Sequence, residues 1–266
     1  MPYRSIMVHM DQSQAALNRV RLAAQLATSY EAHLIGVSAA ELSVVGLAGG
    51  LPPAFLDERE AQLRACCAAL GDHFQDIAGP SAEWRWQLGS PADVVAYHAR
   101  AGDLVIVGRA DPDQAGREFH MPAASALMTT GRPILVVPQE LEHLSADSIV
   151  VAWKAGRAAA LAVELALPLL ERASRVTVLG VGQETTQAEL DDVCRFLLRH
   201  GVKAEPHWRG LIGLTVSGAI VEATRRAGAD LIVCGGYGRP HLLEWALGGV
   251  TEDLIASSPY CCLMAH

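Results

Sequence analysis

The stretch ARAGDLVIVGR, residues 99–109, returns as RRAGADLIVCGG at residues 225–236. In both copies a polar turn ending in aspartate leads into a short, continuous apolar run that ends at glycine. Repetition of a strand together with its flanks indicates a duplicated folding unit. Because the run lacks alternating polar residues, it is typical of a strand covered on both faces, as in a parallel sheet between helices. The stretch therefore predicts a duplicated α/β fold with helices on both faces.

Other landmarks recur in the same order. The segment SIMVHMDQSQAALNRVRLAAQLA from Ser5 matches SIVVAWKAGRAAALAVELALPLL from Ser148, each a strand followed by an amphipathic helix with an alanine-rich face. AHLIGV (32–37) matches RVTVLGV (175–181), and GRPILVVP (131–138) matches SSPYCCLMAH (257–266). We predict two α/β halves, 1–138 and 148–266, joined by the linker 139–147.

The spacing of the landmarks locates an insertion. Ile6 and Ile149 lie 143 positions apart, but Asp103 and Asp230 only 127, so the first copy has 16 extra residues between these landmarks. Residues 41–60 are predicted to form this insertion, either as a loop over the ligand face or as a surface loop without a role. The last strand of each copy would be an exposed apolar edge in an isolated half. We therefore expect these two edges to pair within the chain.

Composition excludes some functions. The chain has 266 residues, 51% of them hydrophobic, and a net charge of −8, which argues against a nucleic acid partner. No apolar run is long enough for a signal peptide or a membrane span, so we expect a cytoplasmic protein without membrane contact. Six cysteines lack the spacing of a zinc site or a disulfide framework and are predicted to be reduced core thiols. No metal site is predicted.

Glycines gather after the second copy of the repeated strand, in GGYGRPHLLEWALGGVT (235–251). They allow a sharp turn and the close approach of a bulky group. The second cluster leads into a helix whose N-terminal amides suit a phosphate, and Thr251 adds a hydroxyl. The alternative is a tight strand-to-helix connection that needs small residues only for packing. The location beyond the strand's carboxyl end favours a ligand.

The spacing Gly235, two residues, Gly238, nine residues, Gly248 resembles the ATP-binding signature of the universal stress protein family. With the duplication, the whole chain resembles a tandem bacterial member. The resemblance implies two doubly wound parallel five-stranded sheets of order 3-2-1-4-5 that form a pseudo-dimer within the chain. It implies ATP or a related adenine nucleotide as ligand of the C-terminal half, with or without Mg²⁺. The predicted contacts are Ala152, Trp153, Lys154, Val181, Gly235, Gly238, Arg239, Gly248, Gly249, Val250 and Thr251.

Each copy departs from the family pattern in a different place. The first keeps the acid after strand one, Asp11, but has Pro122 and alanines in place of the second glycine cluster. The second keeps the glycines, but Lys154 stands at the acid's position and Gly249 at that of the signature's serine or threonine. We predict that the first copy does not hold a triphosphate, since it has lost the flexible glycines and an amide donor.

Three functions follow from these residues. The first is a regulatory stress-response protein that binds adenine nucleotide in its second half. The second is an interaction module with the same fold that has lost the nucleotide. The third is slow ATP hydrolysis, but no set of general base and metal carboxylates is visible, so no catalytic residue is predicted. The protein partners and the association of two chains into a homodimer are left open.

Overall fold

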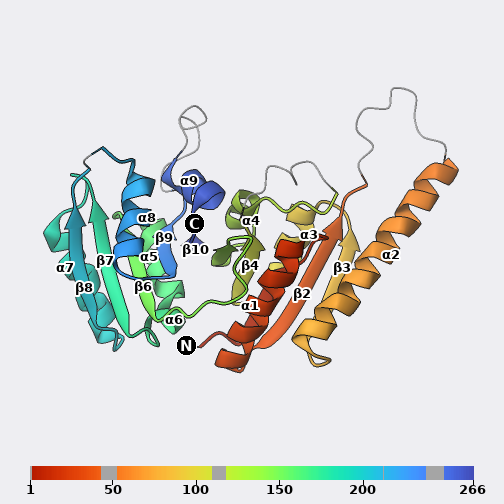
Figure 1. The fold of residues 1–266 in the computed structure, drawn as a ribbon, viewed down its shortest axis with the longest axis horizontal. Helices are drawn as coiled ribbons and strands as arrows, with labels where there is room; N and C mark the ends of the chain where they lie inside the picture. Colours follow the sequence, from red (N-terminus) through yellow and green to blue (C-terminus); the bar gives the residue numbers. More distant parts are fainter. Residues whose placement is uncertain (1, 43–52, 110–117, 212, 238–248) are drawn as a thin grey trace.

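The computed structural model describes residues 2–42, 53–109, 118–211, 213–237 and 249–266, and within each half strands alternate with helical segments (Figure 1). The first half contributes β1 (Ser5–His9), α1 (Gln14–Tyr30), β2 (His33–Ala40), α2 (Pro53–Ala78), β3 (Glu83–Leu88), α3 (Pro91–Ala99), β4 (Leu104–Gly108), α4 (Ala123–Thr129) and β5 (Ile134–Val137).

The second half repeats this order with one additional short helix, α6. It contributes β6 (Ser148–Trp153), α5 (Arg157–Leu165), α6 (Leu167–Leu170), β7 (Arg175–Val181), α7 (Gln187–Arg199), β8 (Ala204–Arg209), α8 (Val216–Arg226), β9 (Leu231–Gly235), α9 (Val250–Ser257) and β10 (Cys261–Ala265). The duplication predicted from the repeated stretch is thus present element by element.

The ten strands form one continuous sheet of order β3-β2-β1-β4-β5-β10-β9-β6-β7-β8. Within each half all strands are parallel and follow the predicted order 3-2-1-4-5. The halves meet where β5 and β10 pair antiparallel, with Leu135 opposite Leu263. The expectation that the two final strands pair inside the chain is confirmed, and the pairing removes two apolar edges.

Helices cover both faces of the sheet, and the buried apolar residues form two clusters. One lies under α1, α2, α5, α6 and α7 and includes fully buried Phe74. The other lies under α3, α4, α8 and α9. Both clusters run across the junction of the halves, so the halves share their core. Burial on each face explains why the strands read as continuous apolar runs.

The aspartates of the repeated stretch have a structural role. Asp103 Oδ2 accepts hydrogen bonds from the backbone N–H groups of Arg4 (2.8 Å) and Ser5 (3.0 Å), at the start of β1. Asp230 Oδ2 accepts from Ser145 (2.9 Å) and Ala146 (3.1 Å), just before β6. In each half the aspartate before the fourth strand therefore holds the chain as it approaches the first.

The segment 139–147 runs along α1 and is fixed to it. Gln25 on α1 donates from Nε2 to the carbonyl of Leu144 (3.0 Å) and accepts from its N–H (3.1 Å). Asn18, two turns earlier, donates to the carbonyl of Gln139 at 3.1 Å. Leu144 itself is buried in the core. The predicted linker is therefore an ordered connection along one face of a helix.

The predicted insertion needs correction. Residues 53–60, predicted to belong to a surface loop, form the first turns of α2, which has 26 residues where α7 of the second half has 13. An ion pair between Glu60 and Arg64 supports this extension at i,i+4 spacing. Trp208, on the outermost strand β8, is 48% exposed, and its Nε1 donates to the Gly182 carbonyl at 2.8 Å.

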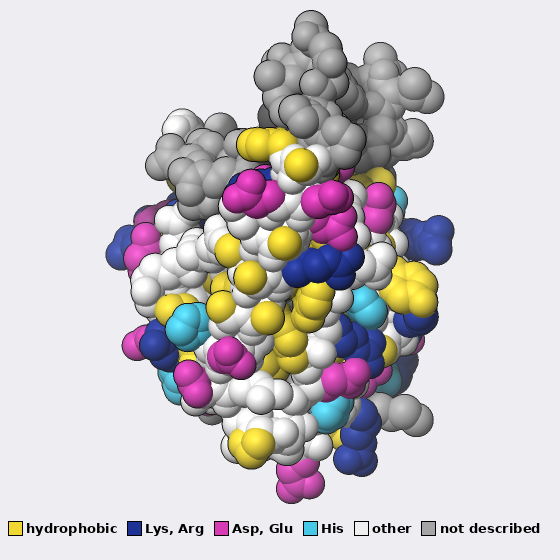
Figure 2. Space-filling model, turned by 90° about the vertical axis from the view of Figure 1, so that its right-hand side faces the viewer, with side chains coloured by type: hydrophobic (Ala, Val, Ile, Leu, Met, Phe, Trp, Pro, Cys, Tyr) yellow, Lys and Arg dark blue, Asp and Glu magenta, His cyan; other side chains and the backbone are white. Residues whose placement is uncertain are grey.

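The surface charges are of mixed sign, and the cysteines are free thiols. Seen from the α2 side, acidic, basic and histidine side chains are interspersed (Figure 2). All six cysteines are free, and four of them, Cys67, Cys234, Cys261 and Cys262, are buried. Burial raises the pKa of Cys262 to about 12, so its thiol stays protonated at neutral pH. In the described ranges, no helix is long and apolar enough to cross a membrane.

Candidate functional site

The strand order reverses between β6 and β9 in the second half, and the predicted nucleotide contacts gather at the carboxyl ends of these strands. Ala152 pairs with Cys234 in the sheet, so Trp153, Lys154 and Gly235 follow on neighbouring strands. Val181 ends β7, the next strand outward. Ligands of doubly wound sheets bind in the crevice at such a reversal.

The helix that follows the glycine stretch begins at the same edge. Gly249 is the N-cap of α9 and has extended backbone angles, and no described side chain caps the helix there. Tyr237, just beyond β9, donates its backbone N–H to Thr251 Oγ1 at 3.2 Å. The two ends of the glycine stretch are therefore adjacent. Three predicted contacts, Gly238, Arg239 and Gly248, lie outside the described residues.

Two of the glycines are required by packing. A Cβ on Gly235 would lie 2.5 Å from the backbone nitrogen of Ala159 and 2.8 Å from the carbonyl carbon of Ala158, at the start of α5. A Cβ on Gly236 would overlap Leu127 of α4. These contacts account for both glycines without a ligand, as the packing interpretation proposes. They leave Gly249 and Thr251 as the described residues that favour binding.

The side chains at the end of β6 have different surroundings. Lys154 is 62% exposed and forms an ion pair with Glu184, with 2.6 Å between Nζ and Oε2. Trp153 is half-buried and packs against the core, and its Nε1 has no hydrogen-bond partner among the described residues. Lys154 is thus an exposed cation at this edge, but it is already partly neutralised by Glu184.

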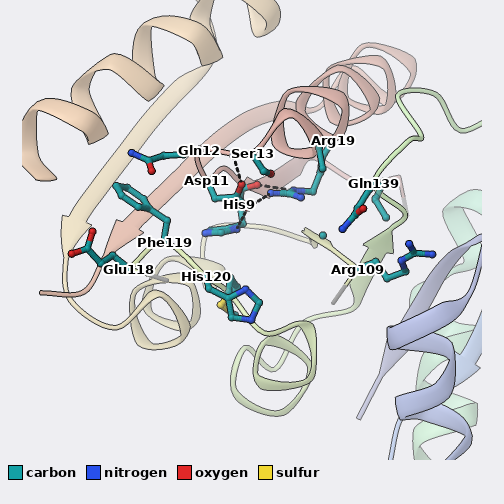
Figure 3. A pocket seen from close by; sticks show the side chains of 14 residues that line it. His9, Asp11, Gln12, Ser13, Arg19, Arg109, Glu118, Phe119, His120 and Gln139 are labelled. Atoms are coloured by element: carbon teal, nitrogen blue, oxygen red, sulfur yellow. Dashed lines mark hydrogen bonds and ion pairs between the residues drawn. The ribbon is translucent and has the colours of Figure 1, made fainter. Parts of the chain in front are cut away.

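A pocket of about 310 Å³ lies at the corresponding edge of the first half (Figure 3). Its wall combines polar and apolar side chains from β1, α1, the end of β4 and the segment before α4. The lining residues are His9, Asp11, Gln12, Ser13, Ala15, Arg19, Gly108, Arg109, Glu118, Phe119, His120, Met121, Val137 and Gln139. Asp11 was the acid singled out in the sequence, whereas Arg19 was not considered.

A buried ion pair organises this pocket. Arg19, only 3% exposed, donates from Nη2 to Asp11 Oδ2 (2.9 Å) and from Nε to the His9 carbonyl (2.8 Å). Burial alone would raise the pKa of Asp11, but Arg19, His9 and hydrogen bonds from Ser13 together lower it well below its ordinary value. Asp11 is therefore ionised, and its charge is compensated by Arg19.

The same pair explains Gly108. A Cβ at this position would overlap the Arg19 guanidinium, so the glycine that ends β4 makes room for an arginine. By the repeat spacing, Arg19 corresponds to Ala162 in the second half, which is buried in the core. The two halves use the glycine after the fourth strand differently: one accommodates a guanidinium and the other the backbone of α5.

The comparisons with known proteins agree on the fold. The model of the universal stress protein family matches residues 211–266. No curated protein matches the chain. A solved universal stress protein from Archaeoglobus fulgidus DSM 4304 has a TM-score of 0.75, with 98% of this chain and 95% of that one covered at 14% identity. A functionally unknown protein from Pseudomonas aeruginosa PAO1 has a TM-score of 0.57, with 98% and 92% covered at 18% identity.

The chain is thus a duplicated, doubly wound α/β protein with a pocket at the carboxyl ends of its first-half strands. Its fold is that of a universal stress protein of the same two-half length, and residues 211–266 match that family in sequence. The predicted resemblance to tandem universal stress proteins is confirmed. At sequence identities of 14% and 18%, the two solved structures are evidence for the fold alone.

Proposed function

We propose that the protein binds an adenine nucleotide through its second half and acts in a stress response as a regulatory nucleotide-binding protein. The observation that carries the proposal is the N-terminus of α9. It begins beside the reversal of strand order, with Gly249 as an N-cap that lacks a capping side chain among the described residues. The first amides of such a helix are free to bind phosphate oxygens, and the helix dipole favours negative charge there.

The charges around α9 suit a nucleotide that carries its own cation. Lys154 supplies positive charge at the neighbouring strand end, but Glu252 and Asp253 lie in the first turn of α9. Asp253 accepts a hydrogen bond from Ser217 Oγ at 2.7 Å. We therefore propose that the nucleotide binds as its Mg²⁺ complex, in which the metal offsets part of the phosphate charge. The described residues contain no group of three or more His, Cys, Asp or Glu able to hold a metal.

The first half is proposed not to hold a triphosphate. Its buried cation, Arg19, is already compensated by Asp11. Glu118, another lining residue, adds a carboxylate that Arg59 holds with two hydrogen bonds of 3.1 and 2.6 Å. A highly charged anion would therefore meet two carboxylates and a single lining cation, Arg109, that forms no carboxylate pair among the described residues.

The charge of the N-cap residue tests the proposal. Gly249→Asp and Gly249→Asn introduce N-caps of nearly equal quality and almost equal size, and the backbone angles of Gly249 suit both. Only the aspartate repels phosphate. We expect calorimetry with Mg²⁺-ATP and with AMP to show binding by the wild type and by Gly249→Asn. Gly249→Asp should bind ATP at least about tenfold more weakly, the equivalent of roughly 1.4 kcal/mol.

Mass spectrometry of small molecules released by denaturing the purified protein complements this titration. Adenine nucleotide recovered from the wild type and lost from Gly249→Asp would support the proposal. A wild type that releases no nucleotide and binds none when it is added would overturn it.

An interaction module without nucleotide is the second candidate. Packing explains Gly235 and Gly236, and three large apolar side chains, Trp208, Leu211 and Leu214, are 44–48% exposed around the connection from β8 to α8. Exposed apolar side chains that lie together favour protein contacts. If this candidate is right, Gly249→Asp retains every cellular phenotype of the wild type, whereas a Trp208→Ser, Leu211→Ser variant loses it.

A further inference from the structure

Helices α4 and α9 connect the carboxyl edges of the two halves. Helix α9 begins at the glycine stretch of the second half, and its C-cap, Ser258, lies against the first half. Helix α4 begins in the first half and reaches the second. It follows pocket residue Met121 of the first half, and its Leu127 lies against Gly236 of the second. The two helices also contact each other.

The C-terminus of α9 is held by a first-half cation. Arg109 Nη1 donates to the carbonyl of Ser258 at 3.3 Å. Terminal carbonyls of a helix lack partners inside the helix and carry partial negative charge, so a guanidinium there satisfies an acceptor and complements the dipole. In Figure 3 Arg109 points from the end of β4 toward the second half. The same residue lines the first-half pocket.

The glycine stretch is held at its other side by α4. Leu127 is buried, and its Cδ2 is so close to Gly236 that no Cβ fits between them. The next residue, Tyr237, bonds to Thr251 in the first turn of α9. First-half side chains therefore contact both the start of the glycine stretch and the end of the helix that follows it.

We infer that Arg109 and Leu127 are positioning residues for nucleotide binding by the other half. The inference rests on the proposed function, and it adds that the second half needs the first to set the orientation of α9. Arg109 fixes the helix end remote from the phosphates, and Leu127 fixes Gly236, the neighbour of the residue that bonds to Thr251. Neither residue need touch the nucleotide.

The first test separates this role from general stability. Arg109→Met keeps most of the side-chain length but loses the donors, Arg109→Lys keeps the cation, and Arg132→Met is the matched control. Arg132 also donates to a carbonyl, that of Arg100 at 3.1 Å, but within the first half. We expect Arg109→Met to raise the calorimetric Kd for Mg²⁺-ATP roughly five- to tenfold. Arg109→Lys and Arg132→Met should remain within about twofold of the wild type.

A second test uses the contact between Leu127 and Gly236. Gly236→Ala forces a methyl group against Leu127 and should weaken nucleotide binding, whereas Leu127→Ala in the same chain makes room and should restore it. Because the second change also relieves overpacking, recovery of affinity supports positioning when thermal unfolding without nucleotide shows that Gly236→Ala alone is fully folded at the temperature of the titration.

The outcomes are distinguishable. A wild type that binds no adenine nucleotide overturns the proposed function and this inference with it. A wild type that binds, together with an Arg109→Met variant of equal affinity, overturns the inference alone. Equal weakening by Arg109→Met and Arg132→Met also overturns it, since the effect would then be general. Thermal unfolding without nucleotide, measured on every variant, identifies those that fail to fold.

Discussion

His9 and Asp11 lie two residues apart at the end of β1, and both titrate differently in the folded and unfolded chain. His9 is 1% exposed, and burial, which outweighs the carboxylate of Asp11, lowers its pKa to about 4, with Arg19 and His120 adding to the decrease. The folded protein therefore keeps His9 neutral under mildly acidic conditions, whereas the unfolded chain protonates it near its ordinary pKa of about 6.5.

This difference gives a prediction for stability against pH. Between about pH 6.5 and 4 the unfolded state binds more protons at His9, so the free energy of unfolding falls as pH falls. We expect a loss of roughly 1–3 kcal/mol over this window. Urea unfolding at several pH values should show it, and His9→Asn should flatten the slope there. Below about pH 4, protonation of Asp11 should destabilise further, because its pKa is lowered in the folded state. Equal slopes in both proteins would contradict the assignment to His9.

At this scale the sequence indicated Asp11 but not its partner. The acid was visible because it ends an apolar strand. Arg19 was missed because an arginine on an amphipathic helix ordinarily lies in solvent. A signal was nevertheless present: Arg19 lies in register with Ala16, Ala23 and Leu26, on the stripe of α1 that faces the sheet. A charged residue in an apolar stripe predicts a buried ion pair when an acid ends the adjacent strand.

Hydrogen bonds fix the connection 139–147 to helix α1. Gln25 makes two hydrogen bonds to the backbone of Leu144, a pairing that mimics strand contacts. We predict that Gln25→Ala lowers the free energy of unfolding by about 1–2 kcal/mol, because both backbone groups of Leu144 lose their partner. It should also speed hydrogen exchange at the Leu144 amide.

Gln75→Ala is the matched control, since Gln75 is an exposed glutamine on α2. This substitution should change stability by no more than about 0.5 kcal/mol. If the two variants unfold alike, the connection is not held by Gln25, and the order of residues 139–147 has another cause.

Element types were predictable, but their lengths and edges were less so. Periodicity indicated the positions of the helices, yet the inserted residues 53–60 read as loop because of the Gly-Gly at 49–50 and the Pro-Pro at 52–53, although their acidic and basic residues suit a helix surface. The exposure of β8 was also missed. Its Pro206 lacks an N–H and lies on this outermost strand, where it discourages pairing with another sheet.

The whole molecule depends on the pairing of β5 with β10. We predict that a fragment of residues 1–138 made alone exposes the β5 edge and self-associates in size-exclusion chromatography. Adding a fragment of residues 148–266 should convert it to a one-to-one complex with the circular dichroism spectrum of the intact chain. A first-half fragment that stays monomeric and folded would show that the shared sheet is dispensable for folding.

Pairing of the halves was foreseen from two apolar final strands, whereas the roles of α4 and α9 could not be. The need of an edge strand for a partner can be inferred from its own short sequence, because an apolar strand with unpaired backbone groups tends to associate. The contacts of Arg109 with Ser258 and of Leu127 with Gly236 depend on how the twisted sheet turns one half against the other. No short sequence pattern predicts the orientation of one half relative to the other.

The place of β10 also has a consequence for biosynthesis. Although it follows every other strand along the chain, it occupies the sixth position in the order of ten, between β5 and β9. The ribosome therefore synthesises nine strands before β10. Until β10 is made, the edges of β5 and β9 that it covers stay unpaired. Slow translation of the residues before Cys261 would prolong that exposure, and the nascent chain would depend most on chaperones just before the sheet closes.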